Sequence, residues 1–367
     1  MKTLRILGTR GIPAAHGGFE TFAEHLAIYL QRRGWQVVVY CQHNGTEAIY
    51  EDTWKGIHRI HVSVRGDTPL SSVFFDLKSH LHAIKRRELC LTLGYNTAVF
   101  ALLLRVLGIK NVMNMDGIEW KRQKWGALLK LWFKANDWLG CWLANQLVAD
   151  HPVIKQHLMT RVSQKKITMI PYGADQVQSA QASLLQSYGL EPQQYAILIA
   201  RAEPENSILE VVKAWSAKPR GKKLVVLGHY DFSHAYHVAV KDAASDEVVF
   251  VGAIYEKAVV SALRYFALFY VHGHQVGGTN PSLVESLGAG NAVLANDNQY
   301  NRWVCGDGAV YFSDVPSCAQ KIECLLSKPE LIQRLAKEGG KRFDNAFRWE
   351  FILEQYEALL SRQEFHL

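Results

Sequence analysis

Two glycine-rich loops are the first candidates for ligand binding in this sequence. The segment 16–19 contains Gly17 and Gly18, directly before a predicted helix. The segment 273–290, GHQVGGTNPSLVESLGAG, begins with a second loop, which leads into another predicted helix near Ser282. Glycines let the backbone approach a ligand closely, and a helix N-terminus presents free N–H groups and a positive dipole end to an anion. Both loops are candidate phosphate sites, although a tight turn without a ligand would explain the first equally well.

The second loop also offers polar side chains close to the start of its helix. Thr279 or Asn280 could cap the helix that begins near Ser282. Pro281 suits the first turn of that helix. Glu285 lies about one turn inside, where its carboxylate could accept hydrogen bonds from a ribose diol. The alternative for Glu285 is a surface residue that the helix dipole favours.

Arg201 and Asp116 each end a predicted strand, and the carboxyl ends of strands line the ligand crevice in doubly wound sheets. Arg201 has a permanent charge and a fork of donors that suit a diphosphate. It could instead form a surface ion pair with Glu203 or Glu205. Asp116 could act as an acid or base, bind sugar hydroxyls, or cap the next helix.

The elements that must position these residues alternate between strand and helix. Apolar residues at helical spacing predict a helix over 19–33, between strands at 4–9 and 35–40. This βαβ start is typical of a parallel α/β sheet. Further strands are predicted at 58–64, 88–94, 110–116, 195–201, 223–228, 248–252, 268–273 and 292–296, and further helices at 99–107, 208–215, 257–265 and 282–289. With a linker at 169–175, the sequence predicts an α/β fold of two Rossmann-like domains in tandem.

Composition excludes several classes of protein. Of the 367 residues 49% are hydrophobic and 20% charged, which excludes a disordered chain. Six scattered cysteines without a C-x-x-C pair indicate reduced thiols, and no apolar stretch is long enough to span a membrane. The formal charge is +7, and residues 117–171 hold nine lysines and arginines against three acidic residues. The same segment contains five of the ten tryptophans: Trp120, Trp125, Trp132, Trp138 and Trp142.

Residues 125–147 place tryptophans and leucines over a wide arc of a predicted helix. One interpretation is a helix that enters a membrane interface, with basic residues attracted to anionic lipid. The other is a helix buried by two neighbours in the core. Nucleic acid is a poorer partner, because the basic residues do not lie on one helix face and no recognition module is present.

Six segments together resemble a known family: GTRGIPAAHGGFETFAEHLAIYL, MDGIEWKRQKW, MIPYGAD, ARAEPENSILE, VGGTNPSLVESLGAGNAVLAND and RWEFILEQYEALL. Through them the chain resembles, from end to end, the GT-B glycosyltransferases of family 4, and most of all the bacterial rhamnosyltransferases of capsule and O-antigen synthesis. The resemblance implies a Rossmann-like acceptor domain at 1–168, a Rossmann-like nucleotide-sugar domain at 169–345, and a helix at 346–367 that packs back on the first domain. It also implies that the domains face a central cleft, and that sugar is transferred with retention and without a metal ion or a cofactor.

The resemblance implies roles for individual residues on the donor side. Gly17 and Gly18 would lie under the donor diphosphate, and Arg201 would pair with it as a catalytic residue. Residues 280–283 would supply N–H groups to the diphosphate, and Glu285 would hold the ribose. The complete donor-binding set is Gly17, Gly18, Arg201, Asn280, Pro281, Ser282, Leu283 and Glu285.

On the acceptor side, the resemblance places Asp116, the second catalytic candidate, where it faces the acceptor and the transferred sugar. Glu119, Trp120 and Lys121 follow it in the chain and are further acceptor-side candidates.

Three residues depart from the pattern of the broad family. Gly277 stands where a glutamate usually contacts the donor sugar, and Asn206 replaces a lysine that usually follows the arginine. Both departures go with the rhamnosyltransferase-like subset and favour a dTDP-rhamnose donor. Trp303 stands where a glutamate is common, and the sequence offers no functional account of it.

The sequence therefore predicts transfer of rhamnose from dTDP-rhamnose to a lipid-diphosphate-linked saccharide. We expect a cytoplasmic protein, peripherally associated with the anionic inner face of the plasma membrane. One alternative is a UDP-hexose or GDP-mannose transferase of the same fold, and another is a non-catalytic, membrane-docked scaffold. An NAD-dependent oxidoreductase is the poorest fit, because the first βαβ unit lacks the G-x-G-x-x-G fingerprint.

Overall fold

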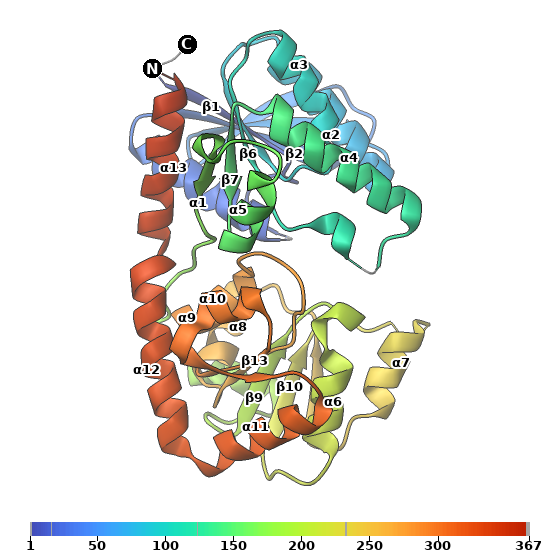
Figure 1. Ribbon diagram of the computed structural model, residues 1–367, viewed down its shortest axis with the longest axis vertical. Coiled ribbons are helices and arrows are strands. Elements are labelled where there is room, and N and C mark those ends of the chain that lie inside the picture. The colour runs from blue at the N-terminus through green and yellow to red at the C-terminus, as the bar shows by residue number, and fades with distance from the viewer. Residues whose placement is uncertain (1, 16, 123, 232, 365–367) are drawn as a thin grey trace. The chain divides into compact units, whose positions relative to one another are not determined.

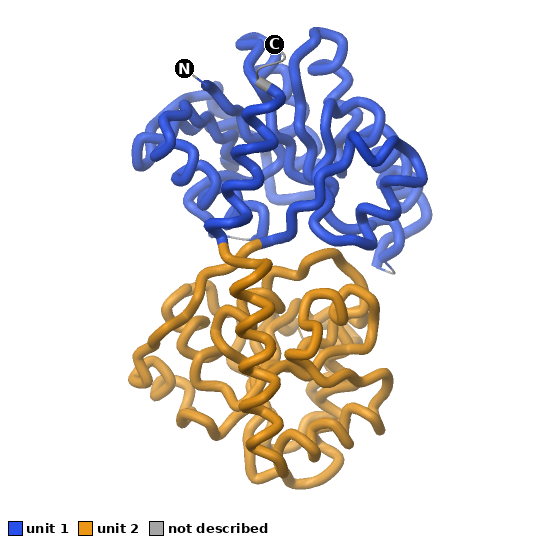
Figure 2. Tube along the Cα trace, turned by 60° about the vertical axis from the view of Figure 1, so that its left-hand side comes forward, with its two compact units in different colours: residues 1–172, 349–367 blue, residues 173–348 orange. Residues whose placement is uncertain are grey.

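The computed structural model describes residues 2–15, 17–122, 124–231 and 233–364 (Figure 1). The chain divides into two compact units (Figure 2). Unit 1 comprises residues 1–172 and 349–367, and unit 2 comprises residues 173–348. The two boundaries lie a few residues after those expected from the sequence, at 168/169 and 345/346.

Unit 1 contains a sheet of eight described strands in the order β3-β4-β2-β1-β5-β6-β7-β8. Every neighbouring pair is parallel except β3 and β4, which are antiparallel. The central strands consist almost wholly of buried residues, as expected when helices cover both faces of a sheet. The strands are β1 (Thr3–Leu7), β2 (Gln36–Asn44), β3 (Tyr50–Trp54), β4 (Ile57–Val64), β5 (Leu89–Leu93), β6 (Asn111–Asn114), β7 (Gln146–Ala149) and β8 (Ile167–Met169).

Helices pack on both faces of this sheet (Figure 1). On one face, α1 (Gly18–Arg32) and α13 (Trp349–Glu364) share a core with Leu4 and Ile6 of β1. On the other face, α2 (Pro69–Ala83) and α3 (Ala101–Val106) pack against Leu7. Alternate residues of β1 thus serve opposite cores. The remaining helices of the unit are α4 (Ala127–Leu143) and α5 (Pro152–Met159), with 3-10 turns at Ala98–Phe100, Glu119–Lys121 and Gln164–Lys166.

Unit 2 contains a parallel sheet of six described strands in the order β11-β10-β9-β12-β13-β14. The strands are β9 (Tyr195–Ile199), β10 (Lys223–Leu227), β11 (Val248–Gly252), β12 (Tyr270–His272), β13 (Val293–Asn296) and β14 (Ala309–Phe312). The helices are α6 (Ile208–Ser216), α7 (Ala235–Asp242), α8 (Lys257–Tyr265), α9 (Pro281–Gly288), α10 (Gln299–Cys305), α11 (Val315–Ser327) and α12 (Pro329–Ala346), with 3-10 turns at Ala182–Tyr188, Pro204–Asn206 and Gly306–Gly308. Two apolar cores, one on each face, hold the helices to the sheet.

Three strand predictions extended two residues too far toward their carboxyl ends. The strand predicted at 4–9 ends at Leu7, the strand predicted at 110–116 ends at Asn114, and the strand predicted at 195–201 ends at Ile199. Asp116 and Arg201 therefore do not end strands, and each lies in a loop two residues beyond one. Asp116 leaves the strand conformation because its φ is +52°, in the left-handed region.

Candidate functional site

In unit 2, two candidate donor-binding segments meet at one edge of the sheet. Arg201 follows β9, and the loop before α9 follows β12, which pairs with β9 in the sheet. Both strands are parallel, so both segments lie at the carboxyl-end edge, where doubly wound sheets bind ligands.

The Arg201 side chain is exposed at this edge. Within the described part of the chain its guanidinium forms no ion pair, so pairing with Glu203 or Glu205 is not observed. The Arg201 backbone is held instead, because its carbonyl oxygen accepts a hydrogen bond of 2.8 Å from the Asn206 side-chain amide. A guanidinium on a braced backbone, without a carboxylate to neutralise it, suits an anionic ligand.

The N-terminus of α9 is capped by the side chain of Asn280. The Asn280 side-chain oxygen accepts a hydrogen bond of 3.0 Å from the Ser282 N–H, and the Leu283 N–H donates to the Asn280 carbonyl oxygen at 3.1 Å. Pro281 has no N–H group. In this conformation the N–H groups of Ser282 and Leu283 are therefore already bonded, and a diphosphate would have to replace the Asn280 side chain to reach Ser282.

Glu285 is held by a cluster that the sequence did not reveal. Its carboxylate forms an ion pair of 2.6 Å with the nearly buried guanidinium of Arg264 on α8. Arg264 also donates to the Ser282 hydroxyl at 3.0 Å, and the Tyr270 hydroxyl lies 2.7 Å from the same oxygen. Burial raises the pKa of Tyr270 to about 12, so it stays a neutral hydroxyl. Glu285 is thus an ion-paired residue with a fixed orientation, and a dipole-favoured surface position does not describe it.

In unit 1, the loop after β1 ends at the start of α1. Gly17 is the N-cap of α1 and Gly18 its first residue, while His16 lies outside the described residues. No side chain of the described residues caps α1, so its first N–H groups are open to a ligand, unlike those of α9. The buried Glu20 braces the loop by accepting a hydrogen bond of 2.9 Å from the Arg10 N–H.

Asp116 lies in the loop after β6, at the same edge of the unit 1 sheet. Its N–H donates to the Asn114 side-chain oxygen at 3.0 Å. Ile118, and not Asp116, occupies the N-cap of the following 3-10 turn, so the capping alternative is wrong. A non-glycine residue with positive φ costs energy and is found disproportionately at functional sites.

The other acceptor-side candidates of unit 1 are held inside the same loop. The Glu119 carboxylate accepts hydrogen bonds from Arg122 at 3.0 Å and Trp125 at 3.1 Å. The Trp120 indole N–H donates at 2.8 Å to Asp137, and the Lys121 ammonium lies over the Trp120 ring. Glu119 and Trp120 thus shape the loop, while Lys121 is exposed.

Asp137 is the centre of a buried network that sequence reasoning missed. This carboxylate is 1% exposed and accepts from His157 at 2.9 Å and from Arg161 at 3.0 Å, besides Trp120. A charged residue within an apolar helical pattern was the available signal, because a buried charge needs such partners.

Helix α4 turns a mixed face inward, with Phe133 and Cys141 beside Asn136 and Asp137, and most of its other apolar residues outward. Asn136 and Asp137 are buried, whereas Leu128 is 84% exposed. The other exposed apolar side chains of α4 are Leu129, Leu131, Trp132, Trp138 and Trp142. The interpretation of a helix buried by two neighbours is therefore wrong.

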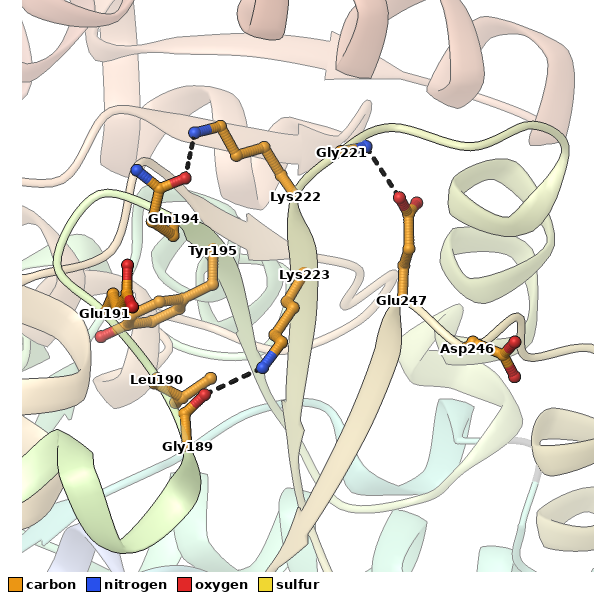
Figure 3. A pocket seen from close by; sticks show the side chains of 10 residues that line it. All are labelled: Gly189, Leu190, Glu191, Gln194, Tyr195, Gly221, Lys222, Lys223, Asp246 and Glu247. Atoms are coloured by element: carbon orange, nitrogen blue, oxygen red, sulfur yellow. Dashed lines mark hydrogen bonds between the residues drawn. The ribbon is translucent and has the colours of Figure 1, made fainter.

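A pocket of unit 2 lies at the opposite edge of the sheet from Arg201, at the amino ends of β9 and β10 (Figure 3). Two of its charged side chains bond to the backbone: Lys223 donates to the Gly189 carbonyl oxygen at 2.8 Å, and Glu247 accepts from the Gly221 N–H at 2.7 Å. It does not contain any of the candidate donor-binding residues. Among the described residues, no group of three His, Cys, Asp or Glu side chains is placed to hold a metal ion.

Comparison with solved structures decides the architecture. Sucrose-phosphate synthase from Thermosynechococcus elongatus is similar over 100% of both chains, with a TM-score of 0.82 and 17% identity. HepE from Anabaena, solved with UDP, is similar over 99% of this chain and 100% of its own, with a TM-score of 0.75 and 15% identity. This chain has the GT-B fold. The predicted α/β architecture of two Rossmann-like domains is thereby confirmed.

Sequence comparisons reach less of the chain. Residues 1–175 match a family described as a domain of unknown function, DUF1972. Over 164 residues the GT-B chain is 27% identical to EpsD of Bacillus subtilis (strain 168), whose name assigns it provisionally to the glycosyltransferases. That match covers 42% of this chain and 42% of EpsD.

Proposed function

We propose that this GT-B protein is a glycosyltransferase that takes its sugar from a nucleotide-sugar donor. The observation that carries the proposal is Arg201, an exposed guanidinium without an ion pair in the described chain, at the carboxyl-end edge of the unit 2 sheet. The similarity to EpsD, and the UDP bound to HepE, agree with a nucleotide-sugar donor.

In the proposed reaction the bond between the anomeric carbon and the diphosphate breaks, and an acceptor hydroxyl bonds to that carbon and gives its proton to the Asp116 carboxylate. The departing nucleotide diphosphate takes the electron pair and gains negative charge. Arg201 is a permanently charged donor for that charge. In unit 1 the N-terminus of α1, which no described side chain caps, is a separate candidate anion site. Glu285, held by Arg264, would bind the ribose through the oxygen that faces away from the guanidinium. Asp116 would face the acceptor and the transferred sugar, and transfer would proceed with retention.

We further propose that the donor is dTDP-rhamnose. Gly277 has φ +151°, a conformation that side chains other than glycine rarely adopt, so this loop does not favour the glutamate of the broad family. Asn206 is buried, and its side-chain amide donates a hydrogen bond to the Arg201 carbonyl oxygen. The amide is uncharged, so the positive charge of the family's lysine is absent at this position. Trp303 packs edge-on against Phe347 and under Arg342, which is a structural reason for its presence.

A thermal-shift panel tests the donor. A ligand that binds only the folded state stabilises it, by about 2.7 kcal/mol at 100 times its Kd. We expect dTDP-rhamnose to raise the unfolding midpoint by about 5 °C or more under such conditions, and UDP-glucose and GDP-mannose to raise it less. A larger shift with UDP-glucose or GDP-mannose would support the alternative transferases. No shift with any nucleotide sugar, together with no donor hydrolysis, would support the scaffold.

We also propose that unit 1 docks on an anionic membrane that carries a lipid-diphosphate-linked saccharide acceptor. The outward face of α4 is mainly apolar. Exposed apolar side chains also occur on α3, which packs against α4, at Leu102 and Val106, and on α2, which packs against α3, at Leu70 and Phe74. None of the helices described here is long and apolar enough to cross a membrane, so the proposal is peripheral docking.

The charges around α4 favour anionic lipid over a neutral surface. Asp137 and Glu119 are neutralised inside the unit by Arg161 and Arg122. Lys121, Lys130 and Lys134 form no ion pair within the described residues and so keep their charge for a partner. Apolar side chains with unpaired lysines around them are what an interfacial helix requires.

Replacing both Leu128 and Leu131 with serine is expected to weaken binding to vesicles that contain phosphatidylglycerol about tenfold, because less apolar surface is buried. Vesicle co-sedimentation measures this, with pure phosphatidylcholine as the neutral comparison. Tyr255→Ser is the matched control, since Tyr255 is 74% exposed but belongs to unit 2. Equal binding by the double variant and the parent protein would contradict docking through α4.

A further inference from the structure

A chain of two hydrogen bonds joins α13 to Asp116. The Asp116 N–H donates to the Asn114 side-chain oxygen at 3.0 Å. The Asn114 side-chain amide donates in turn to the Tyr356 hydroxyl at 2.9 Å. Asn114 and Tyr356 are both buried, at 7% and 1% exposure, so water does not compete for these bonds.

The two partners of the Asn114 side chain determine the orientation of its amide group. A backbone N–H can only donate, so the oxygen of the Asn114 amide must face Asp116. The NH₂ group must then face α13, where the Tyr356 hydroxyl oxygen accepts from it. Rotating the amide by 180° would place two donors opposite each other at Asp116, so one orientation is selected.

Asn114 is itself firmly held. It is the last residue of β6 and pairs with Leu93 of β5, and its carbonyl oxygen accepts from the Gly94 N–H at 2.9 Å. Its side chain therefore extends from a fixed backbone, while Asp116, two residues later, has φ +52°. The bond from the Asp116 N–H offsets part of the cost of that left-handed conformation.

Tyr356 is anchored at the other end of the chain. Its ring lies 4.6 Å from the Phe22 ring of α1, and burial raises the pKa of its hydroxyl, which stays protonated. Helix α13 begins at Trp349, directly after unit 2 ends in the sequence, and the Trp349 ring lies 5.0 Å from that of Tyr172. Helix α13, which follows unit 2 in the sequence, is thus connected to Asp116 by hydrogen bonds through one residue, Asn114.

We propose that Asn114 and Tyr356 are positioning residues for sugar transfer, which hold the Asp116 loop in its reactive conformation from α13. This inference rests on the proposed function, in which Asp116 faces the acceptor. It assigns to the C-terminal helix a contribution to the reaction rate, in addition to its contribution to the core of unit 1.

Tyr356→Phe tests the inference with little risk to the fold, because the ring and its packing against Phe22 are kept. We expect faster amide hydrogen exchange in residues 115–118, and a kcat for transfer about fivefold lower, as the loss of one buried hydrogen bond permits. The KM for the donor should not change, because the donor-binding residues proposed in unit 2 are untouched. Asn114→Leu, which removes both bonds, should lower kcat further.

Tyr40→Phe is the matched control. It also removes a buried hydroxyl of unit 1, one that is bonded to Arg5 at 3.2 Å and to His82 at 3.0 Å, but not to the Asp116 loop. A double variant, Asn114→Leu with Tyr356→Phe, should be no slower than Asn114→Leu alone if the two residues act in series.

The outcomes separate this inference from the proposed function. Unchanged exchange in residues 115–118 of Tyr356→Phe, or an equal loss of kcat in Tyr40→Phe, would overturn the inference while transfer by the parent protein stands. If the parent protein neither binds nor consumes a nucleotide sugar, the proposed function fails, and the inference fails with it even where the exchange result shows that the hydrogen-bond chain exists. Faster exchange with a selective fall in kcat supports both.

Discussion

Replacing Arg201 with alanine is expected to lower the turnover of sugar transfer about 100-fold or more. The departing diphosphate gains negative charge in the transition state, and a fixed donor aimed at that charge stabilises the transition state more than the ground state. Arg201 is suited to this because its guanidinium is exposed, and in the described chain it forms no ion pair that would have to break first.

The measurement is the steady-state rate of nucleotide diphosphate release in the presence of acceptor. Arg201→Lys should be intermediate, because lysine keeps the charge but loses the bidentate fork. Arg334→Ala is the matched control, since Arg334 is an exposed arginine on α12 of the same unit. The unfolding midpoint of Arg201→Ala should match that of the parent protein. Full activity in this variant would remove Arg201 from the mechanism and, with it, the main support for a diphosphate leaving group.

Replacing Asp116 with asparagine is expected to lower transfer by a similar factor, about 100-fold. Asparagine tolerates the left-handed conformation as well as aspartate does, so the backbone at φ +52° should be kept while the charge is lost. The substitution thus isolates the carboxylate. Asp116→Ala adds backbone strain to the loss of charge and should be slower still.

Transfer to acceptor and hydrolysis of donor should be measured separately for these Asp116 variants. Loss of transfer with donor binding retained is the result expected of an acceptor-facing carboxylate. Asp67→Asn is the control, because Asp67 is an exposed aspartate of unit 1 that forms an ion pair of 3.3 Å with Arg10 and lies outside the Asp116 loop. Near-parental transfer in Asp116→Asn, combined with slow transfer in Asp116→Ala, would show that the loop conformation matters and the charge does not.

Features that depend on residues close together in the sequence could be predicted. Apolar periodicity identified most strands and several helices, because a residue buried in a sheet or on a helix face recurs at a fixed spacing. The residue that caps α9 could be predicted as Thr279 or Asn280, because a capping hydrogen bond joins residues that are close in sequence. Here the Ser282 N–H donates to the Asn280 side chain, two residues earlier.

Partners that are distant in sequence could not be predicted. The ion pair that orients Glu285 comes from Arg264, on another helix, and the bond that connects Asp116 to α13 comes from Tyr356, more than 200 residues away. No pattern along the chain encodes such pairs, because they depend on which elements the sheet order places side by side.

For α4, too, the sequence left one question open: whether its apolar residues face the core or the surface. The sequence by itself determined that a helix rich in tryptophan and leucine follows β6, and that the candidate residues belong to two α/β domains. It could not determine which side of that helix faces the core, because a broad apolar arc can face the core as well as the surface. Only the tertiary structure decided this: His157 and Arg161 of α5 and its following turn satisfy the buried Asp137, so the side of the helix that carries Asp137 faces inward and most of the leucines and tryptophans remain outside.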